Sequence, residues 1–263
     1  MTNLINTKVL LSGATILAAA ALIVGATFAF FSDSETSEDN TFVAGSVDLK
    51  VDSTASYLGV NVLSGTWDEK DLTSEKFFNF NDIKPGDYGE NTISLHVVDN
   101  DAWVCAEIDN MVDAENAFLQ LEIDSRSDAD GVTSGELAEG LNFFAWADGG
   151  DNIWQENEQE LFSNLVGPAS DVLNGVIYSL ADSTTGGIPF TESTTNYIGL
   201  AWCAGDLTQS VGSGNMGANV NLNCDGSTLG NEAQTDSVTA DITFHAVQYR
   251  NNLNFNCQDL AQD

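Results

Sequence analysis

Basic residues are scarce in this chain of 263 residues: 7 lysines and arginines stand against 40 aspartates and glutamates, which gives a net charge of −33. A surface this acidic repels nucleic acids and anionic lipids, so we expect neither as a partner. Histidine occurs only twice, at His96 and His245, and neither a His-Glu-x-x-His nor a Gly-x-Ser-x-Gly sequence is present. The sequence signatures of common zinc peptidases and of serine hydrolases are therefore missing.

The cysteines form no Cys-x-x-Cys pair, which argues against a four-thiolate metal site. An even number of cysteines outside the cytoplasm indicates disulfides, and the four present here allow two. Cys203 and Cys224 flank a segment rich in Gly, Ser and Asn, which a bridge between them would close as a loop. Cys105 and Cys257 remain, each in a strand-like run. We therefore expect the pairs Cys203–Cys224 and Cys105–Cys257.

The N-terminal region contains an apolar stretch without charge from Val9 to Phe31, preceded by Lys8. Small residues at Thr27 and Ala29 match positions −3 and −1 of a signal peptidase site. We therefore interpret residues 1–29 as a secretory signal peptide, so that the mature chain begins at Phe30. The alternative is an uncleaved membrane anchor, because a stretch of this length can span a bilayer. After cleavage we expect an extracellular protein with no membrane contact.

Alternation of apolar and polar residues is the main structural signal along the rest of the chain. Ile93, Leu95 and Val97, for example, alternate with polar residues, as expected of a half-buried strand. Strands are predicted on this basis at 47–52, 91–99, 102–108, 118–123, 141–146, 175–180, 197–202 and 237–249. Many short strands separated by turn formers predict an all-β fold, a jelly-roll-like antiparallel β-sandwich with short helices in insertions.

Helical patterns are few and short, at 134–140, 156–164 and 168–174. No repeat and no clear linker divides the chain, so we expect one domain over residues 41–263, with insertions at about 110–195. Residues 30–40 precede it as a separate N-terminal arm.

An acidic turn after residue 147 is the best candidate for a metal site. Asp148, Asp151, Asn152 and Glu156 offer the carboxylate and amide oxygens that Ca²⁺ prefers. The spacing does not match an EF-hand loop, and a solvated acidic turn explains the same residues. Apart from calcium, we expect no cofactor.

The two histidines and most tryptophans have plain structural interpretations. By alternation, His96 and His245 fall on strand faces opposite the apolar residues, and they lie in separate strands. Trp103, Trp146, Trp154 and Trp202 are interpreted as core or turn-packing residues rather than as a platform for sugars. We therefore assign no catalytic residue and expect no enzyme.

A resemblance to a known family emerges from three sequence blocks. The segments 26–33 and 40–50, then 84–87 with 93–95, and finally 230–237 with 244–252 resemble, in this order, the camelysin/TasA family of secreted proteins. Members of this family form biofilm matrix fibres, and related proteins form bundling pili in archaea. The family name also carries a metallopeptidase activity.

The resemblance implies a jelly-roll subunit that polymerises head to tail with itself by donor-strand complementation, forming a filament at the cell surface. The donor residues would be Phe30 and Phe31 as apolar anchors, followed by the polar residues Ser32, Asp33, Ser34, Glu35 and Thr36. The alternative interpretation of the same segment is a disordered chain terminus without a function in assembly. A secreted camelysin-like metallopeptidase and a monomeric cell-surface binding module are the alternative functions.

Overall fold

The computed structural model describes residues 32–34, 47–117, 119–120, 122, 135–162 and 166–262 of the chain. The expected signal peptide, Phe30, Phe31, Glu35 and Thr36 lie outside these described residues. No helix within the described ranges is long and apolar enough to cross a membrane.

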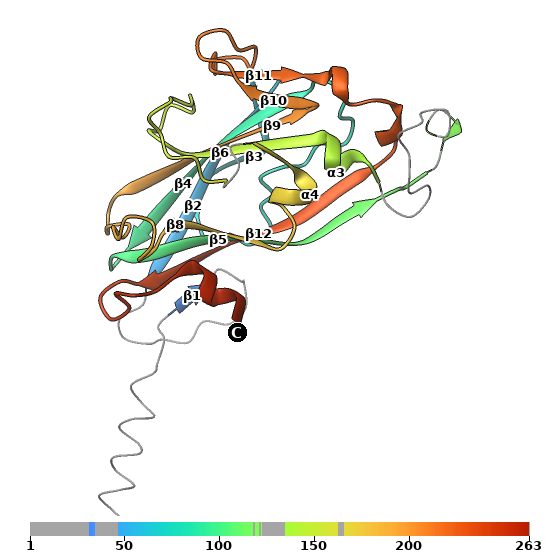
Figure 1. Ribbon diagram of the computed structural model, residues 1–263. Helices are drawn as coiled ribbons and strands as arrows, with labels where there is room; N and C mark the ends of the chain where they lie inside the picture. The colour runs from blue at the N-terminus through green and yellow to red at the C-terminus, as the bar shows by residue number, and fades with distance from the viewer. Residues whose placement is uncertain are drawn as a thin grey trace, which may run out of the picture. The chain divides into compact units, whose positions relative to one another are not determined.

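Two antiparallel sheets form the main body of the described chain (Figure 1). One has six strands in the order β3-β2-β4-β9-β6-β7, and the other has four in the order β1-β12-β5-β8. The first comprises β2 (Asp48–Tyr57), β3 (Val60–Lys70), β4 (Tyr88–Val98), β6 (Leu141–Asp148), β7 (Gly167–Pro168) and β9 (Thr195–Ala204). The second comprises β1 (Ser32–Ser34), β5 (Ala102–Ala114), β8 (Val176–Ala181) and β12 (Ser237–Gln248). This arrangement confirms the predicted all-β sandwich.

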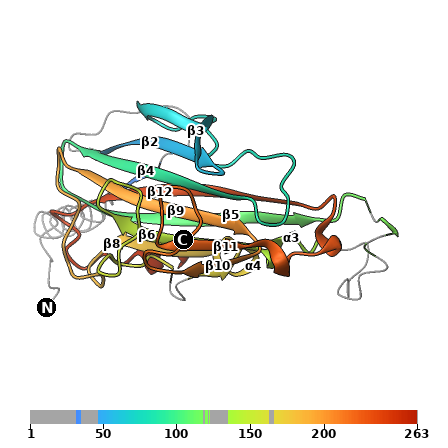
Figure 2. The same cartoon turned by 90° about the horizontal axis from the view of Figure 1, so that it is seen from above.

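The core lies between the two sheets, and the strands contribute alternate side chains to it. Figure 2 shows the strands and helices that surround it, seen from above. Leu95 and Leu200 from the six-stranded sheet pack in the same cluster as Val104 and Phe244 from the four-stranded sheet. Because side chains alternate along a strand, the residues between these point to the two outer faces. The short helices α3 (Leu137–Gly140) and α4 (Ala169–Val172) contribute Ala138 and other small apolar residues to this core.

The outer face of the six-stranded sheet is covered by residues 205–229, which we call the sheet cover. It contains β10 (Asp206–Gln209) and β11 (Leu222–Asp225), which pair antiparallel. Phe144 and Trp146 on the outer side of β6 pack with apolar residues of the cover in a second cluster. A Cβ on Gly199 would approach the Trp146 indole to 2.1 Å, so only glycine leaves room for this ring. The disulfide Cys203–Cys224 joins the cover to β9.

The outer face of the four-stranded sheet is covered by the C-terminal tail, residues 249–262, which includes the 3-10 helix η4 (Cys257–Gln262). The Trp103 indole N–H donates to the Asn252 carbonyl at 2.7 Å, and its ring packs edge-on against Tyr249. The disulfide Cys105–Cys257 joins the tail to β5. Both bridges are therefore the pairs expected from the sequence.

The predicted strands match the structure with a few differences. The strand expected at 118–123 is wrong, because Gln120 and Glu122 are helical. The helix expected at 156–164 is absent from its described part, 156–162, where turns lead into a bridge between Glu160 and Trp146. The hairpin strand β3 and the ribbon strands β10 and β11 were not predicted. Strands β6 and β8 lie in the region expected to contain insertions, yet they belong to the two main sheets.

A buried carboxylate holds the tail against the end of β8. Asp182 is fully buried, and its carboxylate accepts hydrogen bonds from the Ser179 hydroxyl, the Cys257 backbone N–H and both donors of Thr184. Burial alone would raise the pKa of Asp182, but these hydrogen bonds outweigh burial and hold the pKa below its ordinary value. The ionised form is therefore the one that the fold requires.

We predict that Asp182→Asn lowers the free energy of unfolding by about 3 kcal/mol at pH 7, because an amide cannot accept all of these bonds. The folded pKa lies below the unfolded value of 3.8, so this advantage of the wild type is complete above about pH 4. It shrinks as the pH falls further. Urea unfolding of both proteins at pH 7 and pH 3 measures the difference. Asp259→Asn, an exposed carboxylate in the same tail, is the control and should change nothing. A loss that is equal at both pH values would contradict this role.

Candidate functional site

The edge of the four-stranded sheet is formed by the expected donor segment. Ser32, Asp33 and Ser34 form β1 and pair antiparallel with Val247, Ala246 and His245 of β12. Strand β12 pairs along its other side with β5 over its whole length, from Ser237 to Gln248. Of the described strands, none pairs with residues 237–244 on the β1 side. Among the described strands, most of this edge of β12 therefore has no pairing partner.

The part of β12 without a described partner on this side, residues 237–244, borders the core. Val238, Ala240 and Ile242 pack against the core cluster but are only partly buried, whereas Phe244 further along is buried. A strand edge presents unpaired N–H and C=O groups, and here it does so beside partly exposed apolar side chains. The edge therefore combines two incentives for strand addition, backbone pairing and apolar burial.

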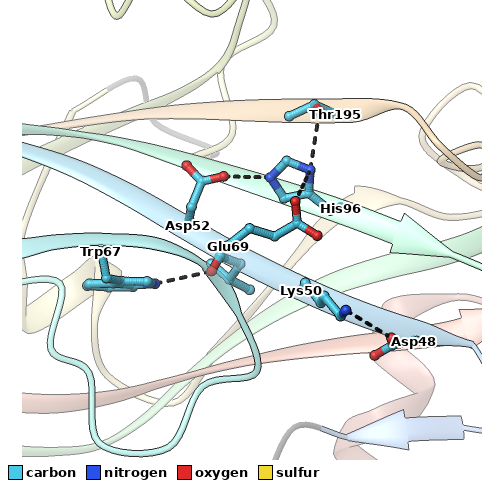
Figure 3. Close-up of polar contacts among 8 residues, drawn as sticks. Asp48, Lys50, Asp52, Trp67, Glu69, His96 and Thr195 are labelled. Atoms are coloured by element: carbon cyan, nitrogen blue, oxygen red, sulfur yellow. Dashed lines mark hydrogen bonds and ion pairs between the residues drawn. The ribbon is translucent and has the colours of Figure 1, made fainter.

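The polar cluster around His96 is the first place to look for peptidase chemistry (Figure 3). It lies on the outer face of the six-stranded sheet, where Asp52 from β2, Glu69 from β3 and Thr195 from β9 surround the ring. Nε2 of His96 lies 2.5 Å from Asp52 Oδ2, and Nδ1 lies 3.3 Å from Thr195 Oγ1 and 3.8 Å from Glu69 Oε2. Both ring nitrogens thus have partners within the protein.

His245 lies on the opposite side of the sandwich, on the outer face of the four-stranded sheet. Its Nε2 is 2.7 Å from Glu107 Oε2 on β5. The alternation rule thus correctly placed both histidines on outer faces, with 19 % and 16 % of their side chains exposed.

The residues present do not fit a catalytic zinc. A catalytic zinc takes three protein ligands, commonly two or three histidines or a Cys/His set, and keeps a fourth position open for water or substrate. Here the two imidazoles are separated by the core, and all four cysteines form disulfides. Asp52 contacts His96 at hydrogen-bond distance, which leaves no room for a metal between the two groups. We therefore derive no step through a metal here.

The acidic turn of residues 148–152 is largely satisfied by its own hydrogen bonds. Asp148 accepts from the Trp146 indole at 3.0 Å and from the backbone N–H groups of Gly150 and Asn152. Asp151 accepts from the Ile153 backbone N–H, and Glu156 is exposed. The carboxylates of Asp148, Asp151 and Glu156 do not gather around one point. The one group of three carboxylates found among the described residues lies elsewhere, at Glu115, Glu136 and Asp236.

Several residues around these sites were not foreseen from the sequence. Asp52, Glu69 and Thr195 come from three different strands, so only the sheet register brings them to His96. Glu90 is a buried carboxyl on the outer side of β4, under the sheet cover, at a position where the sequence predicted no strand. The four tryptophans expected to pack inside are buried, so they form no exposed platform for a sugar.

Comparison with known proteins supports the resemblance for the first part of the chain. Residues 5–102 match the family model described as camelysin metallo-endopeptidase, a stretch that includes β1 to β4. The match confirms the resemblance to camelysin over this part and leaves most of the sandwich uncovered. No curated protein matches the chain.

We predict that the purified protein contains well under one zinc per chain by elemental mass spectrometry, because its donor groups do not converge. The double variant His96→Gln/His245→Gln should show the same metal content as the wild type. One zinc per wild-type chain that disappears in this variant would restore the metallopeptidase interpretation.

Proposed function

We propose that this chain is the secreted structural subunit of an extracellular filament, polymerising through its mature N-terminus rather than acting as an enzyme. The observation that carries the proposal is the pairing of Ser32–Ser34 with an edge of β12 along which no other described strand lies. These residues follow closely on the expected cleavage site after Ala29. Removal of the signal peptide would thus free the strand that fits this edge.

The register between β1 and β12 defines where the rest of the donor strand would lie. In this antiparallel register Ser32 lies opposite Val247, and each step forward along β1 is one step back along β12. Extending it along the open edge places residues 35–42 opposite residues 244–237. In the other direction it places Phe30 opposite Tyr249, whose ring packs on Trp103. Phe30 would thus join an existing apolar cluster of Trp103, Val247, Tyr249 and Phe255.

The donor segment itself gives a reason for exchange between subunits. Residues 32–41 contain no apolar side chain, so this part of the arm stays solvated and can extend from its own subunit. Phe30 and Phe31 at the new terminus are costly in water and gain from burial, with about 150–250 Å² available to each ring. Because a head-to-tail contact of this kind does not close, repetition builds an open filament.

A monomeric surface-binding module is the second candidate, and one observation favours it. Within a single chain, β1 lies on its own β12, so the arm can satisfy the edge without a partner. Exchange would replace this pairing by the same pairing between two subunits. The two functions therefore predict the same register and differ only in which chain supplies β1.

We predict that deleting residues 30–38 leaves a folded protein that does not elongate, because the other strands of both sheets remain. Phe30→Ser/Phe31→Ser should weaken assembly strongly, since losing a large buried aromatic costs about 3–5 kcal/mol. Ser32→Ala/Ser34→Ala keeps the backbone pairing and is the control that should still assemble. Electron microscopy detects filaments, and circular dichroism verifies the fold. Normal filaments from the deletion variant would rule out donor-strand exchange.

A cross-link decides which chain supplies the strand. Asp33 and Ala246 lie directly opposite each other, so Asp33→Cys/Ala246→Cys places two thiols across the contact. Exchange predicts a ladder of covalent oligomers on a non-reducing gel of assembled material, whereas a folded-back arm predicts a cross-linked monomer only. Asp33→Cys alone is the control. It should give neither the ladder nor the cross-linked monomer, and at most a dimer from random collision of two thiols.

A further inference from the structure

A buried polar group lies between the six-stranded sheet and the sheet cover, separate from the assembly edge. Glu90 on the outer side of β4 is only 4 % exposed, and Asn219 in the cover is fully buried. The two side chains are hydrogen-bonded to each other. Asn219 Nδ2 also donates to the Asn152 carbonyl at 3.3 Å, which connects the cover to the acidic turn. Asp148 in this turn is likewise buried and lies near enough to repel Glu90.

Three oxygen atoms of this group are buried without a hydrogen-bond partner: Oε1 of Glu90, Oδ1 of Asn219 and Oδ1 of Asn152. Buried acceptors in native proteins are nearly always satisfied, and where no protein group does so the partner is an ordered water or an ion. Among the described lysines, arginines and histidines, none forms an ion pair with Glu90 or Asp148. The group thus holds two carboxyl groups and three acceptor atoms without a hydrogen-bond partner, and no described lysine, arginine or histidine neutralises it.

Burial of the Glu90 carboxyl disfavours its charged form. Burial raises the pKa of Glu90 to about 7, against the effect of the Asn219 hydrogen bond, and the Asp148 charge raises it further. A bound cation would remove this cost by neutralising the two carboxylates.

We propose that Glu90, Asn152 and Asn219, next to the charge of Asp148, form a calcium-binding site under the sheet cover. Carboxylate and amide oxygens are hard ligands, which favours Ca²⁺ over zinc or copper. Calcium also accepts irregular coordination completed by water, whereas Mg²⁺ demands a near-ideal octahedron. The site keeps Asp148 and Asn152 of the acidic turn and replaces Asp151 and Glu156, which do not converge with them, by Glu90 and Asn219.

The consequence for the structure is a link among three segments that are distant in sequence. The ion would join β4, the acidic turn after β6 and the sheet cover, whose other fixed point is the disulfide Cys203–Cys224. Calcium therefore stabilises the folded chain and holds the cover on the sheet, independently of filament assembly.

The test is thermal unfolding of the full mature chain after chelator treatment, with calcium chloride added at constant ionic strength. The melting temperature of the wild type should rise by about 5–10 °C at a calcium concentration near a hundred times Kd. Glu90→Gln removes the charge and keeps the shape, so it should fold and show no rise. Glu156→Gln, an exposed carboxyl of the same turn, is the matched control and should keep the full rise.

Terbium luminescence provides an independent readout that does not depend on stability. The Trp146 indole donates to Asp148, so bound Tb³⁺ should emit on tryptophan excitation in the wild type. Calcium should displace it at lower concentration than magnesium, and Glu90→Gln should abolish the signal. No response of the wild type to calcium, chelator or terbium would mean that the pocket holds water only and would overturn the proposal. An equal loss in Glu156→Gln, or a full response in Glu90→Gln, would overturn the assigned ligands.

Discussion

The alternation of side chains along the strands is the constraint on which the rest of this structure depends. Residues of one parity, such as Leu95 and Phe244, are committed to the core between the sheets. Ionisable side chains such as His96, His245 and Glu90 therefore lie at positions of the other parity, on the outer faces of the sheets. Because the two outer faces lie on opposite sides of the core, groups on different sheets cannot cooperate. This geometry, rather than the small number of histidines alone, argues against a metallopeptidase centre.

Apolar side chains on the outer faces of the sheets need a covering segment, and each disulfide holds one such segment in place. Cys203–Cys224 holds the sheet cover over Phe144 and Trp146, and Cys105–Cys257 holds the tail over Trp103. In both cases one cysteine occupies an outer position on a central strand, and its partner lies in a covering segment, Cys224 in β11 and Cys257 at the start of η4. Such segments bury little surface alone, so a covalent link limits their freedom in the unfolded chain. The four cysteines thus extend burial beyond a single core.

Regular alternation made most of the fold predictable, and departures from it mark what was missed. Strand β3 escaped prediction because its pairing with β2 shifts register twice, which breaks the period of two along Val60–Lys70. The run at 118–123 fits either period at that length, and Gln120 and Glu122 within it are helical. The disulfides followed from the polar, Gly-rich segment between Cys203 and Cys224 and from the two cysteines that remained. The burial of Glu90 could not be predicted in this way. The segment that buries it, the sheet cover with Asn219, lies far along the chain and meets β4 only in the folded structure.

In the proposed filament, charge would oppose uncontrolled association of chains along the edge of β12. Chains with a net charge of −33 repel one another, and the arm that would fill the edge is itself acidic at Asp33, Glu35, Glu38 and Asp39. Repulsion between exposed charges is screened over about 8 Å at physiological salt and about 3 Å at 1 M. Added salt would therefore favour approach of the chains, while in the proposed assembly backbone pairing and the two phenylalanines would supply the specific attraction. In the proposed assembly the register along β12 would supply selectivity, because it places Phe30 opposite Tyr249 and its apolar neighbours.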